Sequence, residues 1–185
     1  GNKIWQKTFG GSSEDWGFSV QQTADGGFII AGETMSFGAG YYDVYLIKTD
    51  SAGNSQWQKT FGAGNWDSAR SVQQTADGGF IIAGRTGSFG GGWGVYLIKT
   101  DSAGNSQWQK TFGGSDWDYG YSVQQTADGG FIIAGTTYSF GTGDYDVYLI
   151  KTDSAGNLVW QKTFHGIGED EGYSVQQTKD GGYII

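Results

Sequence analysis

The sequence predicts an all-β protein, a β-propeller of four-stranded antiparallel blades, with about three and a half blades in the chain. Three observations support this prediction: a tandem repeat of about fifty residues, apolar segments of strand length inside each repeat, and glycine-containing turns between those segments. A unit of this size is too small to bury a core by itself, so neighbouring units must pack against each other.

The repeat is defined by three blocks of sequence. SVQQTADGGFII spans Ser19–Ile30, recurs unchanged from Ser71 and Ser122, and recurs from Ser174 with two substitutions; VYLIKTDSAGN occurs three times and WQKTF four times. The units begin near Gly1, Gly53, Gly104 and Gly156. We expect them to form a single propeller domain over residues 1–185, or part of one.

The composition excludes several classes of protein. The 185 residues include 35 glycines and 16% aromatic residues but no proline or cysteine. This composition fits short strands joined by tight turns, because disordered chains are poor in aromatics. Without cysteine there is no disulfide or thiol chemistry. A net charge of −8 argues against a nucleic-acid partner, and no apolar run is long enough for membrane insertion.

Each complete unit contains four expected strands. In the first unit, the first strand is expected at Phe18–Thr23, and Ala24–Gly27 contains the Asp-Gly pair typical of a tight hairpin turn. The second and third strands, Gly27–Gly32 and Val44–Thr49, are nearly continuous apolar runs, which indicates burial on both faces. The fourth, Trp57–Phe61, alternates and should be half exposed at the outer edge. Such a set of strands predicts a propeller blade between two others.

The order of these segments resembles the WD-repeat propellers. SVQQTADGGFIIAG occupies the place of that family's inner strand, Asp-Gly turn and second strand, and VYLIKTDSAGN that of its third strand and turn, but the Gly-His and Trp-Asp dipeptides are missing. Over its full length the chain resembles the near-identical propeller repeats of secreted and cell-surface proteins of archaea and bacteria. This resemblance implies the fold and an extracellular or cell-surface location, and it brings no catalytic residue with it.

The two ends of the chain hold parts of a further blade. A fourth-type strand is expected at Trp5–Phe9 and a second-type strand at Gly182–Ile185, so a closing blade made from them would lack its third strand. An unpaired strand edge is prone to aggregation. Three alternatives stay open: a fragment of a longer propeller, a second chain that completes the ring as a homodimer, or a four-bladed ring with a gap.

Differences between the copies are confined to two kinds of loop. One kind joins the fourth strand to the next first strand, at residues 10–17, 62–69, 113–120 and 165–172. The other joins the second strand to the third, at residues 33–43, 85–94 and 136–146. In a four-stranded antiparallel blade both kinds open on the same face, which we call the variable face. Variable loops on a constant scaffold are typical of a binding site.

The variable face is rich in aromatic and acidic residues. The candidate ligand-binding residues are Trp16, Tyr41, Tyr42, Trp66, Trp93, Trp117, Tyr119 and Tyr145. Twelve acidic residues accompany them, with Arg70 and Arg85 as the only bases. Aromatic rings cover the C–H faces of sugars and carboxylates accept hydroxyl protons, so the pattern favours a glycan, and equally a cationic surface protein. For each loop tryptophan, packing over its own blade is an equal alternative.

Four aspartates are expected to have a structural role, because they keep the same place while their neighbours change: Asp15, Asp67, Asp118 and Asp170. We expect them to accept hydrogen bonds from loop N–H groups or serine hydroxyls. Calcium is an alternative at the Asp50–Asn54 turn and between the acidic loops, but the turn lacks the alternating acids and closing glutamate of calcium loops. No cofactor is therefore expected.

Catalytic signatures are missing from the sequence. His165 is the only histidine and replaces a glycine of the other copies, and there is no cysteine, so neither a catalytic triad nor a usual zinc site can be assembled. We therefore expect no enzyme, no catalytic residue and no metal site. The predicted function is a non-catalytic, multivalent binding or adhesion module that uses the variable face. The alternatives are a structural scaffold without a ligand and a glycan-acting enzyme with its site on that face.

Overall fold

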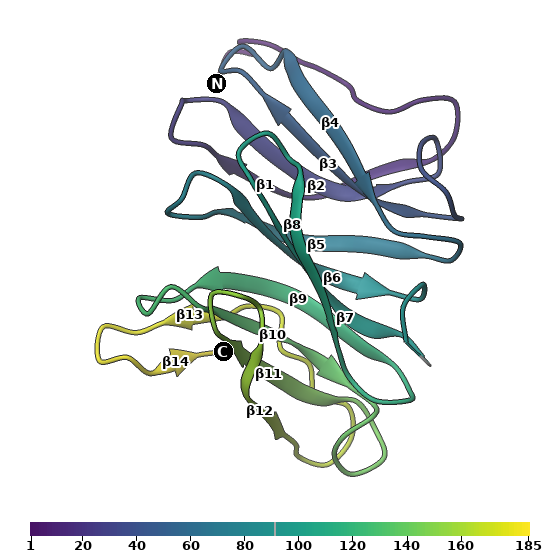
Figure 1. Ribbon diagram of the computed structural model, residues 1–185, viewed down its shortest axis with the longest axis vertical. Helices are drawn as coiled ribbons and strands as arrows, with labels where there is room; N and C mark the ends of the chain where they lie inside the picture. The colour runs from purple at the N-terminus through teal and green to yellow at the C-terminus, as the bar shows by residue number, and fades with distance from the viewer. Residues whose placement is uncertain (91) are drawn as a thin grey trace.

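The computed structural model of the chain describes residues 1–90 and 92–185. It is all-β, with three four-stranded antiparallel sheets and one two-stranded sheet, which follow one another in the order of the sequence (Figure 1). Within the described residues no closed ring is seen, since the main contacts between sheets join the first to the second and the second to the third. This part of the chain contains no helix with the length and apolar character needed to cross a membrane.

Each four-stranded sheet is one repeat unit with its strands side by side in sequence order. The first sheet contains β1 (Asp15–Gln22), β2 (Phe28–Thr34), β3 (Asp43–Thr49) and β4 (Ser55–Phe61). The second contains β5 (Asp67–Gln74), β6 (Phe80–Thr86), β7 (Gly94–Thr100) and β8 (Ser106–Phe112). The third contains β9 (Asp118–Gln125), β10 (Phe131–Thr137), β11 (Asp146–Thr152) and β12 (Leu158–Phe164). The two-stranded sheet contains β13 (Gln176–Gln177) and β14 (Tyr183–Ile184), the latter shorter than the predicted strand Gly182–Ile185.

The strands extend further toward the variable face than the sequence predicts. β1 begins at Asp15 instead of Phe18, and β2 continues beyond Gly32 to Thr34. The extension pairs Asp15 with Thr34, and the Thr34 hydroxyl donates a hydrogen bond to the Asp15 carboxylate. Because this side-chain bond holds the strand ends together beyond the apolar run, hydrophobicity alone places the boundary in the wrong position.

The predicted strand at Trp5–Phe9 is wrong, because residues 1–10 form no regular structure. A strand needs a hydrogen-bonded neighbour, and within the described chain no third strand lies beside this segment. The Trp5 ring nevertheless packs edge-on against Phe28 of β2, with ring centroids 5.8 Å apart. Trp57 of β4 packs against Phe80 of the next sheet at the same distance, 5.8 Å. The segment Trp5–Phe9 thus takes the packing position of a fourth strand but lacks the backbone hydrogen bonds that would pair it with a third strand.

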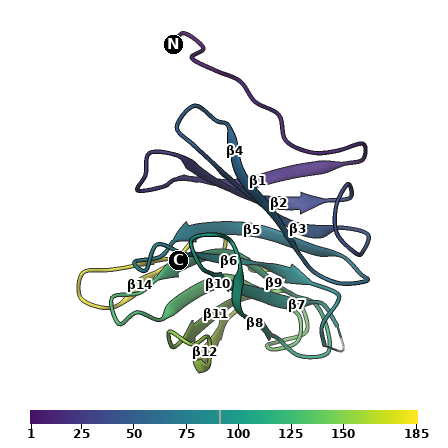
Figure 2. The same ribbon diagram turned by 45° about the horizontal axis from the view of Figure 1, so that its top comes forward.

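The middle strands are buried on both faces, as the sequence predicts. All residues of β3 and β10 are buried, whereas β4 and β8 are partly exposed. One apolar cluster joins Ile29 and Leu46 of the first sheet to Phe80 and Ile98 of the second, and a second cluster joins the second sheet to the third. Figure 2 shows the sheets stacked on one another. The core therefore lies between the units, so that each unit depends on its neighbours.

The invariant SVQQ segment joins neighbouring sheets by hydrogen bonds. The Gln73 side chain of β5 accepts a bond of 2.7 Å from the N–H of Gln125 in β9, and the Ser71 hydroxyl oxygen accepts one of 3.2 Å from the N–H of Val123. The same pair of bonds joins β1 to β5, and β9 to the chain around β13. These bonds satisfy backbone N–H groups that face the adjacent sheet, which gives a physical reason for the identity of the copies here.

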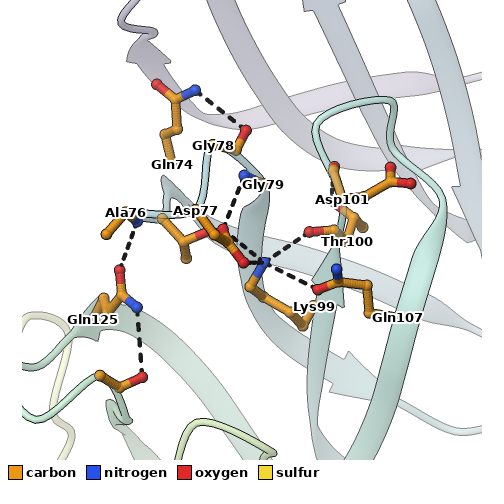
Figure 3. A network of polar contacts seen from close by, with 12 residues as sticks. Gln74, Ala76, Asp77, Gly78, Gly79, Lys99, Thr100, Asp101, Gln107 and Gln125 are labelled. Atoms are coloured by element: carbon orange, nitrogen blue, oxygen red, sulfur yellow. Dashed lines mark hydrogen bonds and ion pairs between the residues drawn. The ribbon is translucent and has the colours of Figure 1, made fainter.

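A lysine lies buried in the third strand of every four-stranded sheet. Lys99 of β7 is 4% exposed. Its ammonium group donates to the Asp77 carboxylate (2.9 Å to Oδ2), to the Thr100 carbonyl (2.8 Å) and to the Gln107 side chain (3.2 Å), as Figure 3 shows. The equivalent ion pairs are Lys48 with Asp25 and Lys151 with Asp128. The apolar appearance of the third strand hides this buried charge, which is tolerated because its donors are paired.

Candidate functional site

The two kinds of variable loop lie against each other at one end of the sheets. The N–H of Asp67, at the start of β5, donates to the carbonyl of Tyr42 at 2.7 Å, and Tyr42 forms a parallel bridge with Trp66. Trp93 and Trp117 form the equivalent bridge one sheet further along. In Figure 1 the β4–β5 connection lies on the right, and the tight turns between β5 and β6 and between β13 and β14 lie on the left. Loops from different units therefore form a continuous surface.

Aspartates at the start of the first strands close these loops. The Asp67 carboxylate accepts hydrogen bonds from the Ala63 N–H at 3.0 Å and from the Ser88 hydroxyl at 2.5 Å. The Thr86 hydroxyl donates to its other oxygen. The equivalent loop N–H bonds to Asp15, Asp118 and Asp170, and the equivalent hydroxyls bond to Asp15 and Asp118. Both Asp67 oxygens are engaged inside the protein, which supports a structural role.

Five of the twelve acidic residues of the variable face are buried: Glu33, Asp43, Asp67, Asp118 and Asp146. The Asp43 carboxylate, for example, accepts hydrogen bonds from the N–H groups of Ala39 at 2.8 Å and Gly40 at 3.1 Å. Burial raises the pKa of Asp43, and the nearby charge of Asp67 raises it further. The sequence predicts that the acids of this face accept hydrogen bonds from hydroxyl groups of a ligand. Asp43 and Asp67 are instead used by the loops as internal acceptors.

An aromatic cavity of about 550 Å³ lies between the loops of the first two sheets. It is lined by Tyr41, Asn65, Trp66, Gly87, Gly90, Gly92 and Trp93. Trp66 stacks on Tyr42 with ring centroids 4.7 Å apart and meets Trp93 edge-on at 6.1 Å. The Trp66 indole N–H donates to the buried Glu33 carboxylate at 3.1 Å, and Tyr41 is 71% exposed at the rim. Trp66 therefore forms a fixed aromatic wall of the cavity, and Tyr41 forms a solvent-exposed wall.

A second aromatic group surrounds Tyr145 at the next pair of sheets. Its ring stacks with Trp117 at 6.4 Å and with Tyr119 at 6.2 Å, and it meets Tyr138 edge-on at 5.3 Å. Burial, together with the nearby Tyr119, raises the pKa of Tyr145 to about 12. Its hydroxyl thus stays protonated at neutral pH. Trp117 remains 52% exposed, so this group presents a ring to solvent.

Arg85 joins the two aromatic groups. Its guanidinium carbon lies 4.9 Å from the Trp66 ring, 5.2 Å from the Trp93 ring and 5.2 Å from the Tyr119 ring, which are cation–π distances. In the sequence Arg85 is only one of two bases near the loops, and Asn65 carries no signal at all. The sequence signal at this place is the glycine-rich β6–β7 loop. Glycine is required there because a Cβ on Gly92 would meet the Ser115 carbonyl oxygen at 2.4 Å.

The structure brings most of the sequence-predicted site residues together. Tyr41, Tyr42, Trp66 and Trp93 lie in or beside the cavity, and Trp117, Tyr119 and Tyr145 form the second group. Trp16 lies in β1 at the end of the series of sheets and is 53% exposed. The neighbouring Glu14 carboxylate accepts a hydrogen bond from the Tyr42 hydroxyl at 2.6 Å. Trp16 therefore stands at the edge of the surface rather than in the cavity.

Across residues 1–90 and 92–185 there is no group of three or more histidine, cysteine, aspartate or glutamate residues placed to hold a metal ion. In the Asp50–Asn54 turn, the Asp50 carboxylate accepts hydrogen bonds from the N–H groups of Ala52 at 2.9 Å and Asn54 at 2.8 Å. The Asn54 side-chain N–H donates to the second Asp50 oxygen at 2.9 Å, so both carboxylate oxygens are internal acceptors.

Comparison with known proteins shows similarity of fold only. No protein-family model matches the chain, and no curated protein matches it either. Among solved structures, it resembles a protein of unknown function from Bacteroides caccae with a TM-score of 0.56 and 14% sequence identity. The similarity covers 89% of this chain and 50% of that one, so the chain spans about half the length of the matched structure.

Proposed function

We propose that the chain is a non-catalytic binding module that holds a glycan against the aromatic rings of its variable face. The cavity lined by Tyr41, Trp66 and Trp93 is the observation that supports this most directly. Its volume of about 550 Å³ lies within the usual range of ligand sites, about 300–1,000 Å³. Flat indole and phenol rings cover the apolar C–H faces of a sugar ring and bury little polar surface.

Polar groups at the cavity fit the hydroxyls of such a ligand. The Asn65 side-chain N–H donates to the Gly87 carbonyl at 2.9 Å, which fixes the amide. Among the described residues no donor reaches its Oδ1 atom, which is therefore available to accept a sugar hydroxyl. A small number of fixed polar groups in an aromatic cavity is the usual composition of a selective small-molecule site.

The second aromatic group, around Trp117 and Tyr145, provides a further contact surface. A polymeric glycan that touches both surfaces gains from effective concentration, since the second contact becomes intramolecular. Two such surfaces suit adhesion to a polysaccharide at a cell surface or outside the cell. A scaffold that binds no ligand would not need them.

The repeated sheets fit the blades of a β-propeller, and a second copy of the chain is the partner proposed to extend them. Val20 of β1 is 65% exposed, whereas the equivalent Val72 and Val123 are each 6% exposed under a neighbouring sheet. A preceding sheet would cover Val20 in the same way. Sedimentation should then show a dimer that Val20→Lys converts to a folded monomer. A wild-type protein that is monomeric at every concentration would contradict this.

A glycan array with matched variants tests the binding proposal. Tyr41→Ala removes an exposed wall of the cavity, and Trp117→Ala removes an exposed ring of the second group, so neither change should unfold the protein. Each should weaken glycan binding by about tenfold, equivalent to about 1.4 kcal/mol. Trp5→Ala removes a partly exposed tryptophan outside the variable loops and should leave binding unchanged. Absence of any glycan ligand for the wild-type protein would favour the scaffold alternative.

A further inference from the structure

The second unit differs from its neighbours at three positions where β5 and β6 meet the variable face. Ser68, Arg70 and Arg85 occupy the places held by Trp16, Phe18 and Glu33 in the first unit and by Tyr119, Tyr121 and Thr136 in the third. A small hydroxyl residue and two arginines thus replace large rings and an acid. Nothing in the repeat itself requires these changes, because the other units fold without them.

Two of these three residues have buried polar atoms without a partner. Ser68 lies directly opposite Arg85 in the β5–β6 register. Among the described residues, neither Ser68 Oγ nor Arg85 Nε has a hydrogen-bond partner, although both atoms are buried and Ser68 is 0% exposed. Buried donors are normally paired, so two on facing residues are unusual. Both can donate to an oxygen.

Arg70 adds a second guanidinium to this position. The β5–β6 register breaks between Ala69 and Ser71, so Arg70 is the extra residue of a β-bulge, and bulges redirect a side chain near functional sites. Its guanidinium carbon lies 3.9 Å above the Phe18 ring. Burial lowers the pKa of Arg70, the nearby charge of Glu33 raises it, and the charge of Arg85 lowers it again, because like charges in proximity repel each other.

Neither arginine forms an ion pair within the described chain. The three ion pairs found there all involve lysine. The buried Glu33 carboxylate, which also influences Arg70, accepts its hydrogen bond from the Trp66 indole. In a protein of net charge −8, two partly buried arginines without a carboxylate partner are unexpected, because buried charges are normally paired. A guanidinium offers a planar pair of donors that matches a carboxylate.

The aromatic cavity and Arg85 have two neighbours in common. Trp66 and Trp93 line the cavity and also flank the Arg85 guanidinium. A sugar ring lying on these indoles would therefore place a substituent beside Arg85. We propose that Ser68, Arg70 and Arg85 form an anion subsite that binds the carboxylate of an acidic sugar, of the uronic acid class, whose ring lies in the adjacent cavity. This inference rests on the proposed glycan-binding function and names its ligand class.

A matched pair of ligands tests the subsite. The intact protein is titrated with methyl β-glucuronide and with methyl β-glucoside, which differ only in the carboxylate, and binding is followed by indole fluorescence. The glucuronide should bind about tenfold more tightly, since a charge-assisted bidentate contact is added. Arg85→Gln should remove this preference, so that the two ligands bind equally, whereas Arg85→Lys should retain part of it. Lys179→Gln, which removes the same charge at a distant hairpin turn, should have no effect.

The outcomes separate the subsite from the binding function. Equal affinity of the wild-type protein for both ligands would overturn the acidic-sugar assignment and leave the glycan proposal intact. Binding of neither ligand would overturn it too, and the glycan array would then decide whether the general function survives. Inorganic phosphate that binds as tightly as the glucuronide, with no loss in Trp66→Ala, would show a simple anion site and likewise overturn the assignment.

Discussion

The Lys99 ammonium nitrogen lies 2.9 Å from Asp77 Oδ2, and the two side chains differ sharply in exposure: 5% for Lys99 and 54% for Asp77. The lysine comes from β7 and the aspartate from the turn between β5 and β6, so the pair fastens the hairpin turn to the third strand (Figure 3). Thr75 donates to the same carboxylate. The two ends of the pair therefore respond differently when their partner is removed. Water can hydrate the exposed Asp77 carboxylate, but it cannot reach the buried Lys99 ammonium group.

Asp77→Asn should therefore destabilise the protein by about 1 kcal/mol, because it leaves the buried Lys99 charge without its counter-ion while the exposed amide is hydrated. Asp180→Asn is the matched control: Asp180 lies in the equivalent turn of the last hairpin, with the same Thr178 and Gly182 contacts, and no ion pair with a lysine forms there among the described residues. Urea unfolding should show a smaller loss for Asp180→Asn. Equal losses would contradict a role for the lysine.

Stability should fall when these turns are acidified. Burial raises the pKa of Asp77, but hydrogen bonds from Thr75 and Lys99 outweigh it and lower the pKa from 3.8 to about 2. Hydrogen bonds from Thr126 and Lys151 likewise lower the pKa of Asp128 to about 2. A carboxylate whose folded pKa lies below its unfolded pKa stabilises the fold above the unfolded value and loses that contribution as pH falls through the folded one.

The urea midpoint should therefore be constant near neutral pH and decline between pH values of about 4 and about 2. The double variant Asp77→Asn and Asp128→Asn should be less stable at neutral pH and should show a shallower decline. An unchanged slope in the double variant would assign acid sensitivity to other carboxylates.

The side chain of Gln73 should contribute to the packing of one sheet on the next. Its amide oxygen accepts the Gln125 N–H at 2.7 Å, so Gln73→Ala leaves a backbone donor facing an apolar interface. The expected loss is about 1 kcal/mol. Gln176 holds the same place in the last unit but is exposed, so Gln176→Ala should change stability by less than about 0.5 kcal/mol. A reversed order would contradict the role of the SVQQ segment between sheets.

Gly84 should tolerate no side chain. A Cβ there would lie 1.8 Å from the Ser68 carbonyl oxygen of the adjacent strand, so Gly84→Ala must separate β5 from β6 and should destabilise the protein by roughly 3 kcal/mol. Gly64 is the matched control, because a Cβ there meets nothing within 4 Å. Thermal unfolding of Gly64→Ala should be within a few degrees of wild type. A similar small effect at Gly84 would contradict the close strand approach.

The local elements and much of the candidate surface could be predicted from sequence. Asp-Gly turns, apolar runs and the fifty-residue period place three sets of four strands, because turn chemistry and strand periodicity are local properties. The restriction of differences to two kinds of loop identified the aromatic residues that lie around Trp66 and Tyr145. The acidic residues were harder to interpret, since burial of Asp43 or Asp67 depends on loop closure rather than on residue type.

Sequence by itself determined the repeat, the strands, their turns and the end of the sheets at which variation gathers. Tertiary structure decided which charged groups are internal and which remain available. Lys99 stands in an apolar strand yet meets Asp77 from a distant turn, and Arg85 gains its place among Trp66, Trp93 and Tyr119 from three separate segments. The physical reason is that hydrogen bonding and cation–π contact depend on distances between segments, which the order of residues along one strand does not contain.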